Sequence, residues 1–420
     1  MDEPGRYQCS DATEDYQLMA ERSFTLKSEP TVAAVARPIR VLHMGSPMGL
    51  YGAERWILAL IKHLPAQKVE SWVSVIKDKR GVEAQLCTAA SANGFRTHIF
   101  EAYGKLSCRA IKQLQEFILL NEIDIVHTHG YKTDIIGRLA VRGLTCKTVS
   151  TPHGWGANQG LRLKFYELLD RITLRFFDAV VPLSGEIYDS LRYLNRNGTK
   201  LQLIDNGVDL AEIDSSPSLS NDLAAVKARG VTVIGYVGRL DRGKRIDTLI
   251  RAVHKLPVEE KFLCIIGEGP ERTRLQDLAC GLLGSHQYEF MGFRDDRIAA
   301  MRSFDLFVLP SESEGIPRCL MEAMACGIAV IGADIRGCRE LIVDKKTGLL
   351  FAPGDEMALL RQITRLLEDP QLREGLAQSG RSHVRHRFSA EIMALRYQRL
   401  YEQLVMPAIA ESGTVTSQVQ

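Results

Sequence analysis

The sequence has no run approaching the ~18 consecutive apolar residues that a membrane-spanning helix requires, and its N-terminal segment has no apolar signal core. We therefore expect a protein that is neither secreted nor inserted in a membrane by this route. Its nine cysteines include no Cys-x-x-Cys pair and no ligand-like spacing with histidine, which argues against a disulfide framework and against a zinc site. The reducing cytoplasm is the simplest compartment for such a chain.

A large net charge is also absent. The 420 residues carry a formal net charge of only +2, and the positive excess lies in residues 38–212. Nucleic-acid binding normally requires a clustered basic excess, so we predict no nucleic-acid partner. The length and ordinary composition, 45% hydrophobic and 25% charged, fit two large folded domains.

Short β-branched runs alternate with helix-length amphipathic segments from Ile39 onwards, a pattern typical of parallel strands joined by crossover helices. The predicted strands are 39–43, 72–76, 123–127, 148–151 and 179–182, then 231–237, 262–266, 288–291, 306–309 and 329–331. A polar, turn-rich stretch at 205–218 separates the two series. We predict two doubly wound α/β domains facing across a cleft, with ligands bound by loops at the carboxyl ends of the strands.

Changes in pattern place the predicted boundaries. Residues 1–37 are polar, acidic and aperiodic, and we expect them to form a mobile N-terminal leader. We assign 38–212 to the first domain, 213–385 to the second, and 386–420 to a C-terminal helix and tail.

The loop that follows strand 306–309 has the strongest functional pattern. Gly315 allows close approach of the backbone to a ligand, and Pro317 suits the first position of a helix. The free N–H groups of residues 318–320 would then point out of the helix start toward an anion. We expect Glu322 to lie about a turn and a half inside the helix, where its carboxylate can accept two hydroxyl hydrogen bonds, whereas Glu314 stays in the loop.

This segment resembles the Glu-x7-Glu motif of retaining glycosyltransferases of family 4, which have the GT-B fold, and Glu314 and Glu322 match its two glutamates. Residues 238–244 are similar to the family's Gly-Arg-Leu…Lys segment, in which Arg239 and Lys244 match the two cations that clamp the donor diphosphate. Such bonds also stabilise the leaving group as its charge develops. The resemblance implies that the C-terminal helix packs back on the first domain.

Other loops carry weaker similarity to the family. Segments 266–270, 291–294 and 348–350 are similar to loops that line the nucleotide. The resemblance implies a donor-binding set that includes Gly52, Arg239, Lys244, Gly267, Arg294, Glu314, Gly315, Ile316, Pro317, Arg318 and Glu322. A hydride-transfer function is disfavoured, because the Gly-x-Gly at Gly267 lacks the third glycine of a dinucleotide site.

The first domain has matches to the family at three strand ends. The loop containing Gly52 looks like the family's Gly-Gly-x-Glu loop, but Tyr51 replaces the first glycine, so the backbone approach there is narrower or shifted. Residues 125–130 resemble the His-x-His segment, and the match implies that His129 reaches the transferred sugar. Strand alternation points His127 and His129 the same way. His153 and Trp155, at the following strand end, are suited to an acceptor, although His153 is equally explained as structural.

The resemblance implies transfer with retention, without a protein nucleophile, and a catalytic set of His129, Glu314, Arg239 and Lys244. No Asp-x-Asp metal motif is present, so we expect no metal ligands and no cofactor beyond the nucleotide-sugar substrate, with the helix start and the two cations neutralising the diphosphate. The expected acceptor is a saccharide or lipid-linked saccharide, in cell-surface polysaccharide or lipopolysaccharide assembly.

Residues 160–177 place basic side chains among apolar ones at helical spacing. This pattern suggests peripheral contact with the inner face of an anionic membrane, and a helix packed on its own sheet explains it equally well. Two alternatives to transfer also stay open, a nucleotide-sugar epimerase and a non-catalytic protein that binds sugar nucleotides. The Arg239 and Lys244 pair with this glutamate spacing favours transfer over both.

Overall fold

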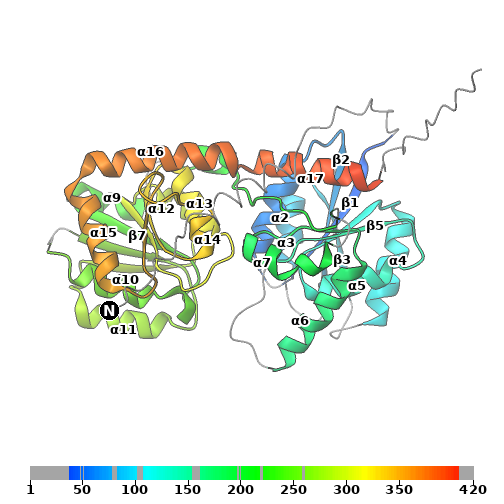
Figure 1. The fold of residues 1–420 in the computed structure, drawn as a ribbon, viewed down its shortest axis with the longest axis horizontal. Helices are drawn as coiled ribbons and strands as arrows, with labels where there is room; N and C mark the ends of the chain where they lie inside the picture. The colour runs from blue at the N-terminus through cyan, green and yellow to red at the C-terminus, as the bar shows by residue number, and fades with distance from the viewer. Residues whose placement is uncertain are drawn as a thin grey trace, which may run out of the picture. The chain divides into compact units, whose positions relative to one another are not determined.

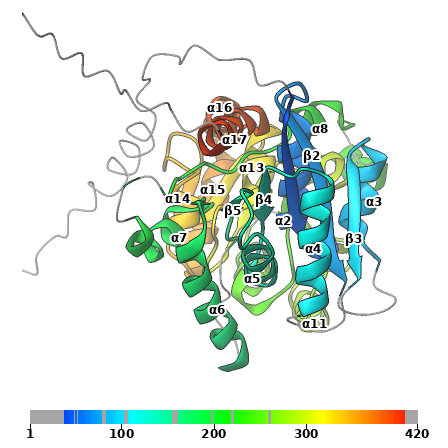
Figure 2. The same cartoon turned by 90° about the vertical axis from the view of Figure 1, so that its right-hand side faces the viewer.

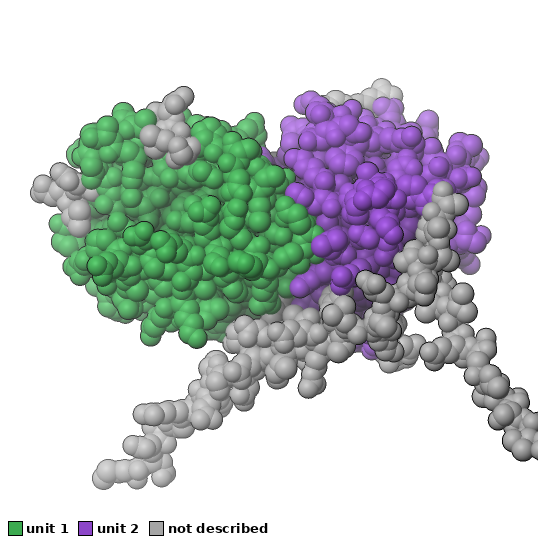
Figure 3. Space-filling view, turned by 90° about the horizontal axis from the view of Figure 1, so that it is seen from above, with its two compact units in different colours: residues 1–25, 183–190, 205–393 green, residues 26–182, 191–204, 394–420 purple. Residues whose placement is uncertain are grey.

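The computed structural model describes residues 37–405 except 48, 51, 78–82, 102–106, 154–160, 196, 197, 199, 218–220 and 258–260. The predicted leader up to residue 36, Tyr51, Trp155 and the tail from residue 406 lie outside the described residues. The chain divides into two compact units (Figure 3). Of the described residues, those within 37–182, 191–204 and 394–405 form one unit, the N-terminal unit, and those within 183–190 and 205–393 form the other, the C-terminal unit.

The N-terminal unit, which contains β1, β2, β3 and β5 in Figure 1, has a parallel six-stranded sheet. Its strand order is β3-β2-β1-β4-β5-β6. Its strands are β1 (Ile39–Gly45), β2 (Val69–Lys77), β3 (Arg96–Glu101), β4 (Ile125–Thr128), β5 (Lys147–Ser150) and β6 (Ala179–Val180). Its helical segments are α2 (Gly52–His63), α3 (Gln85–Ala92), α4 (Cys108–Leu120), α5 (Tyr131–Ala140), α6 (Leu161–Thr173), η1 (Leu174–Phe176) and η2 (Arg192–Leu194). Helix α5 packs between α4 and α6 (Figure 2).

The C-terminal unit contains a second six-stranded parallel sheet, in the order β12-β11-β10-β7-β8-β9. Its strands are β7 (Thr232–Val237), β8 (Lys261–Ile266), β9 (Tyr288–Gly292), β10 (Leu306–Leu309), β11 (Ala329–Ala333) and β12 (Leu349–Phe351). Its helical segments are α7 (Gly185–Ser190), α8 (Leu210–Ser215), α9 (Asn221–Ala228), η3 (Arg242–Lys244), α10 (Ile246–His254), α11 (Arg272–Leu282), α12 (Arg297–Met301), α13 (Arg318–Ala325), α14 (Arg336–Arg339), α15 (Glu356–Glu368) and α16 (Pro370–Arg387).

Both sheets have the same topology, and each has one place where the strand order reverses. In the N-terminal unit the reversal lies between β1 and β4, where His43 is paired in register with His127. In the C-terminal unit it lies between β7 and β10, where Leu306 is paired with Ile234. Loops that leave neighbouring strands at such a reversal diverge to opposite faces, which leaves room for a ligand. The doubly wound prediction is confirmed for both sheets.

Two strands were not predicted, and both lie at sheet edges. Strand β3 is mostly polar and largely exposed, so it has no continuous apolar run, and β12 is only three residues long. Segment 348–350, predicted to be part of a nucleotide-lining loop, instead leads into β12. Strand burial on both faces produces the long apolar runs on which the prediction depended. Strand β3 has no such run, and β12 is apolar but too short to be recognised.

The C-terminal helix α17 (Ala390–Val405) packs on the N-terminal sheet, as predicted. Its residues from Ala394 onwards belong to the N-terminal unit. The buried hydroxyl groups of Tyr397 and Tyr401 lie 2.9 Å from Thr151 Oγ1 and 2.7 Å from His127 Nδ1, respectively. The last helix therefore reaches the strand ends of the first sheet.

Candidate functional site

The strand-order reversal in the C-terminal unit brings Lys244 and Glu314 together. Lys244 ends the short η3 segment after β7, and Glu314 lies in the loop after β10. Lys244 Nζ donates to Glu314 Oε1 at 2.6 Å, and Ser311 Oγ donates to the same oxygen at 2.6 Å. The backbone of Glu312 also donates to Gly243, at 2.9 Å, so the two loops are joined directly. Two residues singled out from separate motifs thus share one place at the strand ends.

The electrostatics of this pair keep Lys244 protonated, so that its ammonium group can contact a negatively charged ligand. Desolvation by burial, the largest influence on Lys244, lowers its pKa, but the carboxylate of Glu314 outweighs it, and the pKa of Lys244 is raised above 10.5. Arg239 differs from Lys244, because its side chain is 71% exposed and its recorded ion pair, with Asp241, spans 3.9 Å. Lys244 is therefore a fixed charge at the base of the site, and Arg239 has the freedom to fold over a ligand.

Helix α13 starts one residue later than predicted. Pro317 is its N-cap, with ψ at 110°, instead of its first helical residue. The Pro317 carbonyl accepts the Leu320 N–H at 3.2 Å, so Leu320 does not offer the free donor that was expected. Of the three predicted donors at this helix start, those of Arg318 and Cys319 remain for an anion.

Close backbone contacts shape the loop around Glu314. A Cβ atom on Gly315 would meet no protein atom within 4 Å, so this backbone borders open space. On its other side, a Cβ atom on Gly337 would lie 1.9 Å from the Gly315 carbonyl oxygen. Gly337, in α14, therefore supports the loop, and sequence analysis missed it because the contact is between distant segments. Ser311, only three residues before Glu314 in the same loop, was missed because nothing in its residue type marked it as the partner of Glu314.

Glu322 lies in a buried ion-pair cluster. Its carboxylate accepts from Arg297 Nη2 at 2.7 Å and from Arg318 Nε at 2.9 Å. Arg297 also donates to Glu212 at 3.0 Å. Burial, the largest influence, raises the pKa of Glu322, but the two arginines outweigh it and hold that pKa at about 2. The structure thus binds this carboxylate to two arginines, and hydroxyl binding by Glu322 stays a prediction.

Gly267 and Arg294 follow β8 and β9. A Cβ atom on Gly267 would lie 1.8 Å from the Gly238 carbonyl oxygen, and its φ of +140° also favours glycine. The residue therefore lets the loops after β7 and β8 touch. Arg294 is held by two acids, with Nε 2.8 Å from Asp296 and Nη1 bonded to Asp222. A donor contact by Arg294 stays a prediction.

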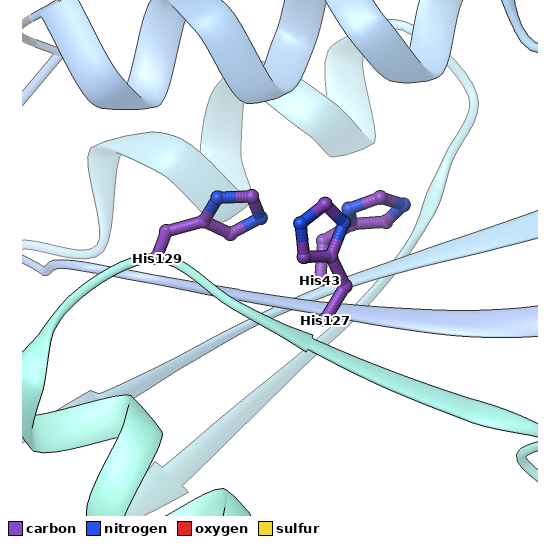
Figure 4. Close-up of side chains that lie close together, drawn as sticks. All are labelled: His43, His127 and His129. Atoms are coloured by element: carbon purple, nitrogen blue, oxygen red, sulfur yellow. The ribbon is translucent and has the colours of Figure 1, made fainter. Parts of the chain in front are cut away.

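At the strand-order reversal of the N-terminal unit lie neutral histidine side chains, whereas the C-terminal unit has the charged pair Lys244 and Glu314 there. His43 on β1 and His127 on β4 have ring centroids 5.2 Å apart, and the rings of His127 and His129 are 4.2 Å apart, on the same side as strand alternation predicts (Figure 4). Thr151 lies 2.8 Å from His127 Nε2. Desolvation by burial lowers the pKa of His43 to about 3 and is the main cause of the lowered pKa values of His127 and His129.

Of the two predicted acceptor residues, His153 borders this histidine group. His153 Nε2 lies 3.5 Å from His129 Nδ1, and desolvation lowers the pKa of His153 to about 4. Trp56, on α2, packs edge-on against His153 and was not singled out from the sequence. Gly52 is the exposed first residue of α2 and has open space where a Cβ would lie.

Comparison with known proteins identifies the family. A model described as Glycosyltransferase Family 4 matches residues 51–212, and one described as Glycosyl transferases group 1 matches residues 224–383. Phosphatidyl-myo-inositol mannosyltransferase of Mycobacterium leprae is 33% identical over 312 residues, which cover 72% of this chain and 78% of that protein. The chain belongs to glycosyltransferase family 4, group 1. It is therefore a retaining glycosyltransferase, and the epimerase and non-catalytic alternatives are set aside.

A second relative of this glycosyltransferase is N-acetylgalactosamine-N,N'-diacetylbacillosaminyl-diphospho-undecaprenol 4-alpha-N-acetylgalactosaminyltransferase of Campylobacter jejuni. It is 27% identical over 360 residues, which cover 80% of this chain and 93% of that protein. Among solved structures, Anabaena HepE in complex with UDP matches with a TM-score of 0.75 at 20% identity, covering 87% of this chain and 100% of that one. This likeness confirms the GT-B fold.

None of the described helices combines the length and the apolar character that crossing a bilayer requires.

Proposed function

We propose that this glycosyltransferase moves a sugar from a nucleotide-diphosphate donor, bound by the loops after β7 and β10, to a saccharide or lipid-linked saccharide acceptor. The contact between Lys244 and Glu314 carries the proposal, because it joins the two donor-side motifs where the strand order reverses. Lys244, Arg239 and the start of α13 bind the diphosphate, and Glu314 binds the sugar. His129 reaches the transferred sugar from the N-terminal unit.

The donor side is proposed to work without an obligatory metal ion. Lys244 is cationic and two backbone N–H groups at the start of α13 remain available, which together can neutralise a diphosphate. UDP is the first nucleoside diphosphate to test for binding, since HepE was solved with UDP. Turnover that persists in EDTA supports this proposal, and turnover lost in EDTA and restored by Mg²⁺ rejects it.

The acceptor is proposed to be a saccharide on a lipid carrier, used in cell-surface polysaccharide or lipopolysaccharide assembly. The two relatives are named for a diphospho-undecaprenol acceptor and for phosphatidyl-myo-inositol, both of which are lipids. His153 and Trp155 are the proposed acceptor contacts. The enzyme would then work at the cytoplasmic face of the membrane.

A surface of the N-terminal unit supports this membrane contact. Leu139 on α5, Leu168 on α6 and Phe176 on η1 are 46%, 55% and 61% exposed. Arginines lie among them: Arg138 Nε donates to the Phe176 carbonyl at 2.8 Å, and the Arg175 guanidinium lies over the Tyr193 ring. Exposed apolar side chains with interleaved cations suit an anionic interface. Arg162 and Lys164, also predicted for this face, have side chains outside the described residues.

Thermal stabilisation by UDP, GDP and ADP tests the donor proposal. We expect one of the three nucleotides to raise the midpoint of thermal unfolding of the wild type. The same nucleotide should hardly change the midpoint of Lys244→Ala. Lys227→Ala is the matched control, because Lys227 pairs with Asp305 at 2.8 Å at the opposite end of the same sheet. No shift with any of the three, or equal shifts in both variants, would reject a diphosphate site at Lys244.

Sedimentation with vesicles tests the membrane proposal. We expect wild type to sediment with phosphatidylglycerol vesicles, and the double variant Arg171→Glu, Arg175→Glu to stay in the supernatant. Arg361→Glu, which reverses an exposed charge in the C-terminal unit, serves as the control. Binding that is insensitive both to anionic lipid and to the double variant removes the proposal.

A further inference from the structure

Three buried histidines from two strands lie together in the N-terminal unit (Figure 4). His43 comes from β1, His127 from β4, and His129 from the residue after β4. One ring nitrogen from each lies within 4.8 Å of those of the other two. His43 and His127 are fully buried, and His129 is 9% exposed.

The hydrogen bonding of these rings is incomplete. Within the described part of the chain, neither ring nitrogen of His43 has a hydrogen-bond partner, and His129 Nε2 has none. A buried polar atom without a partner is costly, so such atoms commonly indicate a bound group. His127 differs, because the hydroxyl groups of Tyr401 and Thr151 contact its two ring nitrogens at 2.7 and 2.8 Å.

We propose that His43, His127 and His129 form a binding site for a divalent transition-metal cation, with Zn²⁺ as the best fit. Neutral imidazole nitrogen is a preferred ligand of Zn²⁺, and three histidines that leave a fourth position open are a known zinc arrangement. With metal–nitrogen distances of about 2.0–2.1 Å, tetrahedral ligands lie about 3.3 Å apart. The observed nitrogens need to close by roughly 1.5 Å at most, which small ring rotations provide.

The groups around the three rings suit a metal site. To free one nitrogen of His127 for the metal, one of its two hydroxyl contacts opens, and the remaining one holds the other nitrogen as an outer-shell partner. Trp56 packs 5.2 Å from the His129 ring and 6.2 Å from the His127 ring, measured between centroids, and shields the group from water. No carboxylate belongs to the ligand set, so the site favours Zn²⁺ over Mg²⁺ or Ca²⁺, which prefer oxygen ligands.

Metal binding here has a consequence for the enzyme that rests on the proposed function. His129 is the histidine proposed to meet the transferred sugar, and a ring that coordinates Zn²⁺ through Nε2 cannot also bond a sugar hydroxyl through that atom. Zn²⁺ therefore inhibits transfer by competing with the donor sugar, and a chelator restores it. The cation is an inhibitor in this scheme, and the reaction itself runs without it.

Calorimetric titration of the full chain with Zn²⁺, without donor or acceptor, tests the site independently of transfer. We expect one high-affinity site in the wild type. His43→Phe, which keeps a buried ring and removes two nitrogens, should weaken binding by more than about 100-fold, and Tyr401→Phe by about 10-fold. Titration with Co²⁺ should produce the intense visible absorption of tetrahedral coordination in the wild type and not in His43→Phe.

Matched controls separate this site from other zinc ligands. His286→Phe removes an exposed histidine of the C-terminal unit and should leave Zn²⁺ affinity unchanged. In EDTA, His43→Phe should retain measurable transfer, and added Zn²⁺ should no longer reduce that variant's own rate. Absence of Zn²⁺ binding in the wild type, or equal affinity in His43→Phe, overturns the metal site. Binding without inhibition retains the site and rejects the role proposed for His129.

Discussion

The two sheets of this enzyme have the same strand order, yet the side chains at their strand-order reversals differ in kind. Between β7 and β10 lies an ion pair, Lys244 with Glu314. Between β1 and β4 lie imidazoles that burial keeps neutral, and one of them, His127, has tyrosine and threonine hydroxyls as partners. Topology thus provides two equivalent places for ligands, and the residues that occupy them determine the chemistry.

The contrast fits a transferase that must handle two different ligands. Phosphates are charged and favour fixed cations and helix starts, whereas sugar hydroxyls are neutral and favour hydrogen-bonding groups that stay uncharged. The surroundings of the two reversals also differ. In the C-terminal unit the buried ion pairs of Glu322 hold α13 in place, whereas in the N-terminal unit α17 packs against the histidines. The following predictions test this difference, starting with the largest effect.

Acid should unfold the N-terminal unit first. Burial lowers the pKa of His43 to about 3 and that of His153 to about 4, below the ordinary 6.5, so the unfolded state binds more protons. Their stabilisation is complete above pH 6.5 and is lost as pH falls toward the folded values, by about 1.4 kcal/mol per pH unit for each histidine. All three tryptophans precede residue 156, so their fluorescence follows this unit during thermal unfolding.

The C-terminal unit should resist the same change. The pKa of Glu322, about 2, lies below its ordinary 4.5, so its stabilisation is present above pH 4.5 and is lost as pH falls toward 2. Burial also lowers the pKa of one histidine of this unit, His383. Between pH 6.5 and 4.5 the fluorescence transition should therefore move more than the unfolding of the C-terminal unit, with a smaller slope in His43→Phe. The contrast between the units would be wrong if unfolding of the C-terminal unit, followed by far-UV circular dichroism, shifted with pH as much as the fluorescence transition does.

Glu322→Gln should destabilise the C-terminal unit by about 3–5 kcal/mol, because it leaves Arg297 and Arg318 buried without a full counter-charge. The measurement is denaturant unfolding followed by circular dichroism, with tryptophan fluorescence as the reference for the other unit. Glu268→Gln breaks the exposed pair with Arg272 and should cost no more than about 1 kcal/mol. Similar losses in the two variants would show that burial does not govern the Glu322 cluster.

Lys244→Ala should reduce kcat by about 10²–10³-fold, since it removes the fixed cation that meets charge developing on the leaving diphosphate. Steady-state transfer with saturating donor measures this effect. Lys227→Ala removes an ion pair at the other end of the sheet and should leave kcat unchanged. A Lys244→Ala enzyme with normal kcat and raised KM would assign Lys244 to ground-state binding alone.

Tyr401→Phe should cost about 1–3 kcal/mol in the N-terminal unit, because His127 Nδ1 loses its buried partner. The fluorescence-detected unfolding transition reports it. Tyr193→Phe removes a hydroxyl that bonds the Arg171 carbonyl at the surface and should have little effect. An unchanged transition in Tyr401→Phe would mean that packing alone holds α17 on this unit.

Sequence patterns predicted most of the fold and the motif residues of the site, but not the residues from other segments that contact them. Buried central strands were found because burial on both faces makes them continuously apolar. Edge strand β3 was missed because it is mostly polar, and edge strand β12 because its apolar run is only three residues long. Motif residues such as Lys244 and Glu314 were recognised individually. Gly337 and Arg297 were not, because each acts through a contact with a segment far away in the chain.

The sequence by itself determined local properties: the alternation of strands and helices, the helix start beside Glu314, and the lack of a zinc-ligand spacing among the cysteines. These follow from side-chain period and turn chemistry, which neighbouring residues set. Tertiary structure alone decided which side chains share a site. Parallel pairing of β1 with β4 puts His43 beside His127, and parallel pairing of β7 with β10 brings Lys244 to Glu314. Strand order is a property of the whole folded sheet, so no spacing along the chain records it.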